Sequence, residues 1–123
     1  MAKILVADDA LFMRELLQDI LSEAGHVVET ANDGLEAAAI VARSAPDLLI
    51  TDILMPGKGG LKLIGELRAQ GCELPIIAIS GGGKDGKLKF LKTAETFANV
   101  RGLDKPFACQ ELLDAVADAL AEG

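Results

Sequence analysis

Runs of apolar residues recur along the chain and predict its secondary structure. Short, nearly continuous runs predict strands at residues 3–7, 48–51 and 76–80, and shorter apolar stretches predict two further strands at residues 27–31 and 99–103. Apolar residues spaced three and four positions apart predict helices at residues 11–21, 35–43, 61–67, 86–98 and 110–121. Strands that alternate with helices indicate an α/β fold, in which helices cover both faces of one parallel sheet.

The composition narrows the class of protein. The chain has 123 residues, half of them hydrophobic, which suits a single domain over residues 1–123 with a substantial core. A net charge of −7 argues against direct binding to nucleic acid. No apolar run is long enough for a membrane span, and the start of the chain does not resemble a signal peptide. We therefore expect a cytoplasmic protein.

Polar side chains stand where the predicted strands end. They are Asp8 and Asp9 after the first strand, Asp52 after the third, Ser80 after the fourth, and Asp104 with Lys105 after the fifth. In open parallel sheets, functional sites form at the carboxyl ends of the strands. We therefore expect these residues to lie together, although Asp8 or Asp9 could also serve as the N-cap of the first helix.

Three neighbouring carboxylates repel one another unless a cation lies among them. Oxygen ligands without histidine or cysteine favour Mg²⁺, with Mn²⁺ as the alternative. A lysine such as Lys105 supplies a further positive charge, and the Ser80 hydroxyl supplies a hydrogen bond. This set suits Asp52 as a nucleophile that attacks phosphorus and forms an acyl phosphate.

Four short motifs, in this order along the chain, carry a resemblance to a known family. They are Asp8-Asp9, Asp52 with Met55-Pro56, Ser80-Gly81, and Lys105-Pro106-Phe107. Together they resemble the CheY-like receiver domain of bacterial two-component response regulators, over essentially the whole chain. The resemblance implies a flavodoxin-like sheet of order 2-1-3-4-5.

The resemblance also implies a role for each site residue. Asp52 would take a phosphoryl group from the phosphohistidine of a sensor histidine kinase or of a histidine phosphotransfer protein. Asp9, Asp52 and the backbone carbonyl of Leu54 would bind Mg²⁺, and Asp8 would act mainly through water. Lys105 would contact the phosphoryl group, Ser80 would move toward it, and the Lys105–Pro106 bond would be cis.

The chain departs from the usual receiver pattern at three places. Most receivers carry an aromatic residue where this chain has Gly102, so the switch must work differently. We expect the glycines from Gly81 to Gly83 to become ordered on phosphorylation. Leu54 and Gly82 lack the polar groups that tune hydrolysis in other receivers, which predicts a long-lived acyl phosphate.

We expect a stand-alone, single-domain signalling protein rather than a conventional enzyme. Its downstream protein target would bind the face formed by the fourth helix, fifth strand and fifth helix, where Lys84, Lys87, Lys89, Lys92, Arg101 and Lys105 give a basic run. We expect no nucleic-acid or membrane partner, and a monomer or weak dimer. One alternative is a pseudo-receiver that acts as an interaction scaffold. A flavodoxin-like electron carrier is a remote one, because the chain contains no Trp or Tyr to hold a flavin.

Overall fold

The computed structural model describes residues 2–55, 58–81 and 94–122. The strands are β1 (Lys3–Ala7), β2 (Val27–Ala31), β3 (Leu48–Asp52), β4 (Ile76–Gly81) and β5 (Val100–Lys105). The helices are α1 (Leu11–Glu23), α2 (Gly34–Ser44), α3 (Gly60–Ala69) and α5 (Cys109–Glu122). Of the helix predicted at residues 86–98, residues 86–93 lie outside the described residues, and Ala94 and Glu95 are helical.

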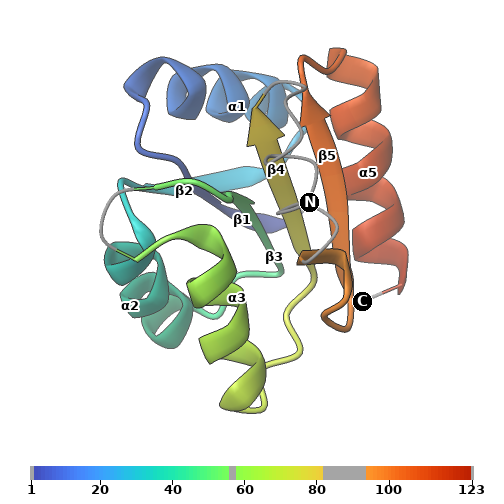
Figure 1. Ribbon diagram of the computed structural model, residues 1–123. Coiled ribbons are helices and arrows are strands. Elements are labelled where there is room, and N and C mark those ends of the chain that lie inside the picture. Colours follow the sequence, from blue (N-terminus) through green and yellow to red (C-terminus); the bar gives the residue numbers. More distant parts are fainter. Residues whose placement is uncertain (1, 56–57, 82–93, 123) are drawn as a thin grey trace.

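All five strands form one parallel sheet of order β2-β1-β3-β4-β5, as predicted (Figure 1). Alternate residues of each strand face opposite sides. On one side, Ile4 and Val6 pack with apolar residues of α1 and α5. On the other side, Leu5 and Ala7 pack with residues of α2 and α3. The central strands are nearly continuous apolar runs because helices cover them on both faces.

Strand β5 extends further than the apolar pattern predicts. Its pairing with β4 includes Ser80 opposite Asp104 and Gly81 opposite Lys105, whereas the prediction ended the strand at Leu103. The predicted start is also wrong by one residue, because Asn99 has a left-handed φ of 59° that a strand does not accommodate. Lys105 is therefore part of the sheet rather than of the loop that follows.

Two helices begin in different ways. At α2, the Asp33 carboxylate accepts the Glu36 N–H at 2.8 Å, and the Glu36 carboxylate accepts the Asn32 N–H at 2.6 Å. Asp33 is therefore the N-cap of α2, and Glu36 also holds the residue before it. Helix α1 follows Ala10, which has no side-chain cap, so neither Asp8 nor Asp9 is its N-cap. Asp8 instead accepts the Ala10 N–H at 2.9 Å.

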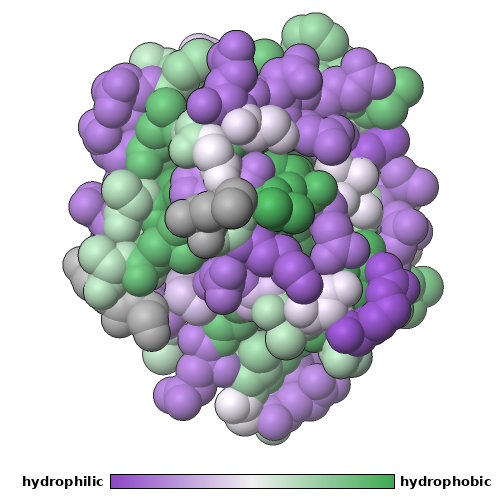
Figure 2. Space-filling view, turned by 180° about the vertical axis from the view of Figure 1, so that it is seen from behind, coloured by the Kyte–Doolittle hydropathy of each residue, from purple (hydrophilic) through white to green (hydrophobic). Residues whose placement is uncertain are grey.

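Hydrophilic and hydrophobic residues are interspersed over the face seen in Figure 2. Among the described residues, no helix is both long and apolar enough to cross a membrane.

Candidate functional site

The carboxyl ends of four strands bring the predicted site residues to one edge of the sheet. Asp8 directly follows β1, Asp52 is the last residue of β3, and Lys105 is the last residue of β5. Ser80 lies one residue before the end of β4 and is buried. Parallel strands in this register place their carboxyl ends side by side, so residues that are nearly one hundred positions apart in the sequence meet here.

Three carboxylates form the centre of the site. One oxygen from each of Asp8, Asp9 and Asp52 lies within 4.8 Å of the others. Asp9 is exposed, while the side chains of Asp8 and Asp52 retain only 2% and 12% of their accessible surface. Two of the three charges are therefore largely removed from water, which is costly unless a cation compensates them.

Lys105 supplies part of this compensation. Its Nζ lies 3.6 Å from Asp8 Oδ2 and 3.5 Å from Asp52 Oδ2, so one ammonium group faces both carboxylates. Three carboxylates and one lysine leave the cluster with two uncompensated negative charges when all are ionised. The cluster is therefore still attractive to a divalent cation.

Asp8 carries the clearest sign of a missing partner. Its Oδ1 accepts the Ala10 N–H, but Oδ2 is buried and no hydrogen bond to it occurs within the described residues. Buried polar atoms are almost always hydrogen-bonded to protein, water or an ion. Within the described residues Asp8 Oδ2 has the Lys105 ammonium at 3.6 Å, too far for a hydrogen bond, and such an oxygen among oxygen-only ligands fits Mg²⁺ with some of its waters retained.

The environment of Asp52 raises the pKa of its carboxyl group above the usual value. Burial is the main cause, and the nearby negative charge of Asp8 acts in the same direction. The Lys105 ammonium and the Leu54 N–H, which donates to Asp52 Oδ1 at 3.2 Å, oppose the increase. Positive charge at this site therefore favours the carboxylate form needed for nucleophilic attack.

The connection that follows Asp52 contains a residue that the sequence analysis overlooked. A Cβ atom at Gly60 would lie 2.2 Å from the backbone oxygen of Asp52, so only glycine fits against the strand there. The signal in the sequence is the glycine-rich run after Met55, which contains Gly57, Gly59 and Gly60. Leu54, predicted as a backbone ligand, has 46% of its surface exposed.

The predicted switch residues are only partly described. Gly81 pairs with Lys105, whereas Gly82 and Gly83 lie outside the described residues. Gly102 lies within β5, and its N–H donates to Glu95 Oε2 at 3.0 Å. The Lys105–Pro106 bond is cis, as predicted. Lys84, Lys87, Lys89 and Lys92 of the basic run lie outside the described residues.

Comparison with known families agrees with this geometry. The family description "Response regulator receiver domain" matches residues 4–117. The chain belongs to this family. Receiver domains of two-component systems bind Mg²⁺ through an acidic cluster and interact with histidine kinases and downstream targets, and Asp8, Asp9 and Asp52 lie close together in this chain.

The sequence is also similar to those of individual curated response regulators. It is 40% identical over 111 residues to the response regulator MprA of Mycobacterium leprae, covering 90% of this chain and 47% of the relative. The chain thus spans about half the length of the curated relatives it matches.

Solved structures give the same fold. A response regulator receiver domain protein from Clostridium thermocellum matches with a TM-score of 0.91 and 27% identity, covering 99% of this chain and 96% of that one. NtrX from Brucella abortus matches with a TM-score of 0.88 and 35% identity, covering 98% of this chain and 27% of that one.

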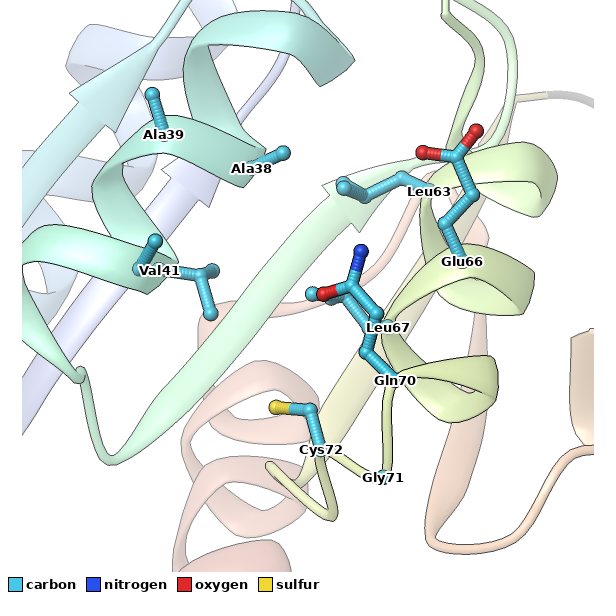
Figure 3. Close-up of a pocket in the computed structure, with 10 residues that line it drawn as sticks. Ala38, Ala39, Val41, Leu63, Glu66, Leu67, Gln70, Gly71 and Cys72 are labelled. Carbon is cyan, nitrogen blue, oxygen red and sulfur yellow. The ribbon is translucent and has the colours of Figure 1, made fainter.

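A hollow beside α3 is separate from the acidic site. It measures about 520 Å³ and lies between α2 and α3, where Ala38, Val41, Leu63 and Leu67 give it apolar walls (Figure 3). None of the three carboxylates lines it. The chemistry of the receiver domain is therefore assigned to the strand ends and not to this hollow.

Proposed function

We propose that Asp52 is the phospho-acceptor in a Mg²⁺-dependent transfer from the phosphohistidine of a sensor histidine kinase or histidine phosphotransfer protein. An Asp52 carboxylate oxygen attacks phosphorus, a new O–P bond forms, and the P–N bond breaks. The imidazole leaves with the electron pair of that bond. The observation that carries the proposal is the Asp52 carboxylate at a strand end, with Lys105 and two further carboxylates around it.

Each site residue has a proposed part in this reaction. Asp9, Asp52 and the Leu54 carbonyl hold Mg²⁺, with Asp8 acting mainly through water. When bound, Mg²⁺ compensates the carboxylates and the charge on the phosphoryl oxygens. Lys105, already directed at Asp52, binds a phosphoryl oxygen, and Ser80 supplies a hydroxyl to another.

The phosphoryl group would then control binding to partner proteins. We propose that the domain is a signalling acceptor that promotes its own phosphorylation and slow dephosphorylation, rather than an enzyme with a separate substrate. The prediction of a long-lived acyl phosphate stands, since the exposed Leu54 side chain offers no group to orient water. Output through the fourth helix, β5 and α5 also remains a prediction.

A pseudo-receiver is the second candidate, and Gly102 in place of the usual aromatic residue favours it. Such a scaffold would bind partners without phosphorylation. The contacts of Lys105 with Asp8 and Asp52 favour the function as a phospho-acceptor.

Intact-protein mass spectrometry after incubation with acetyl phosphate tests the proposal. We expect a gain of one phosphoryl group that requires Mg²⁺ and is absent in Asp52→Asn, because the variant lacks the nucleophilic oxygen. Asp104→Asn is the matched control, since Asp104 is an exposed aspartate beside Lys105. It should be modified like the wild type.

A gain in Asp52→Asn equal to that of the wild type would place the acceptor elsewhere. If the wild type gains nothing, beryllofluoride is added and the amide NMR spectrum is recorded. Unchanged spectra would then favour the pseudo-receiver, since such a site does not recognise a phosphoryl group.

A further inference from the structure

Of the connection between β3 and α3, the structure describes residues 53–55 and 58–59, and α3 begins at Gly60. The Gly60 N–H donates to the Ile53 carbonyl at 2.8 Å, and the Gly60 backbone lies against the Asp52 carbonyl. The Ile53 N–H in turn donates to Ile79 of β4 at 3.0 Å. The inner side of this connection is therefore fixed to the sheet next to Asp52.

Lys58 fixes the outer side of the same connection through its backbone. Its carbonyl accepts the Gly34 N–H at 3.1 Å. A Cβ atom at Gly34 would lie 2.4 Å from that carbonyl, so the two backbones are in close contact and residue 34 must be glycine. Gly34 is the first residue of α2, where N–H groups have no partner within the helix. Lys58 thus supplies a partner that the helix itself cannot provide.

The Lys58 side chain makes a second connection, to α3. Its Nζ pairs with the Glu66 carboxylate, and only 16% of the lysine side chain is exposed. Figure 3 shows Glu66 on α3, with its carboxylate directed toward the N-terminal end of the helix, where the connection enters. A partly buried pair restrains two long side chains more than a fully exposed pair does. One residue therefore joins the connection to both helices on that face of the sheet.

We propose that Lys58 is a positioning residue for the phosphoryl-transfer site. It holds the connection in the conformation in which Asp52 and the Leu54 carbonyl can bind a divalent cation together. Leu54 lies four residues before Lys58, and its N–H already contacts Asp52. Without this restraint the connection samples more conformations, and cation binding must first order it. This inference rests on the proposed function.

The first test is isothermal titration calorimetry with MgCl₂, because the protein has no Trp or Tyr for intrinsic fluorescence. Lys58→Met and Glu66→Gln should each weaken Mg²⁺ binding by about threefold or more, the expected effect of a lost preorganising contact. Lys58→Arg and the charge-reversed pair Lys58→Glu with Glu66→Lys should restore most of the affinity. Lys62→Met, which removes an exposed lysine of α3, is the control.

The second test needs no cation. In metal-free protein, amide hydrogen exchange at Gly34 should be faster in Lys58→Met than in wild type, because loss of the side-chain contact with Glu66 leaves the residue 58 carbonyl, which accepts that N–H, less firmly held. Heat denaturation of the same variants separates positioning from general destabilisation. We expect similar unfolding midpoints for Lys58→Met and Lys62→Met, because 38% of the Glu66 side chain is exposed and its carboxylate stays in water when Lys58 is removed.

The outcomes distinguish the inference from the proposed function. Wild-type protein without Mg²⁺ affinity contradicts the proposed function. Wild type that binds Mg²⁺, with equal affinity in Lys58→Met and Glu66→Gln, overturns the role of Lys58 and leaves the proposed function intact. A loss of affinity in Lys62→Met equal to that in Lys58→Met also overturns it, because charge alone would then explain the effect.

Discussion

Asp52 stands in an environment that disfavours its own charged form. Burial and the neighbouring Asp8 raise the pKa of its carboxyl group, and Lys105 only partly opposes them. A carboxyl group with a raised folded-state pKa stabilises the folded protein at low pH, and this contribution is lost as the pH rises through that pKa. In metal-free protein at neutral pH, the charge on Asp52 is therefore a cost.

Asp52→Asn should consequently be more stable than the wild type at neutral pH without metal. The difference should shrink as the pH falls and Asp52 becomes protonated in both the folded and unfolded states of the wild type. Urea denaturation in EDTA, followed by circular dichroism across the acidic to neutral range, measures this. Asp104→Asn, at an exposed position, should show no such trend. A wild type more stable than Asp52→Asn at neutral pH would mean that the attraction of Lys105 outweighs burial.

At the scale of elements, the apolar pattern predicted the central strands well and the element ends less well. Strands β1 and β2 have the predicted bounds, Lys3–Ala7 and Val27–Ala31. Strand β5 does not, since Asp104 and Lys105 continue the pairing with β4 although neither is apolar. The start of α1 was ambiguous because an aspartate that caps a helix and one that closes a turn both accept a backbone N–H.

Helix α2 ends in a conformation that its sequence does not favour. Ala45 has φ 46° and ψ 63°, the left-handed region in which a Cβ atom is unfavourable. Ala45→Gly should raise the free energy of unfolding by about 0.5–1 kcal/mol, since glycine adopts this conformation freely. Urea denaturation measures the change. The control is Ala42→Gly, at an exposed interior position of the same helix, which should lower stability by about 0.5–1 kcal/mol.

A less stable Ala45→Gly would contradict this expectation. It would show that the greater freedom of glycine in the unfolded chain outweighs the relief in the folded state.

At the scale of the whole molecule, the sheet topology explains why the acidic site was predictable. Once the strands are parallel, their ends must meet, so Asp8, Asp52 and Lys105 could be grouped from the sequence alone. The contacts of Gly34, Lys58 and Gly60 could not be predicted in this way. They join backbone atoms at the starts of two helices to backbone atoms at the end of β3 and in the connection before α3, and the periodicity of apolar side chains does not indicate such contacts.

If the cluster binds Mg²⁺, the ion should stabilise the entire domain. At a Mg²⁺ concentration about tenfold above the dissociation constant, the gain is about 1.4 kcal/mol. Calorimetric unfolding should show a higher midpoint in MgCl₂ than in NaCl of the same ionic strength, and a smaller increase in Asp9→Asn. Equal midpoints in the two salts would contradict Mg²⁺ binding.

The contact between Glu95 and Gly102 has a consequence for solubility. Strand β5 is at one edge of the sheet, and edge strands can pair with strands of other molecules and so begin aggregation. The Glu95 carboxylate already accepts the Gly102 N–H, so an incoming strand must displace a charged group to use that donor. The same contact that holds β5 to the residues before it thus protects the domain from edge-to-edge association.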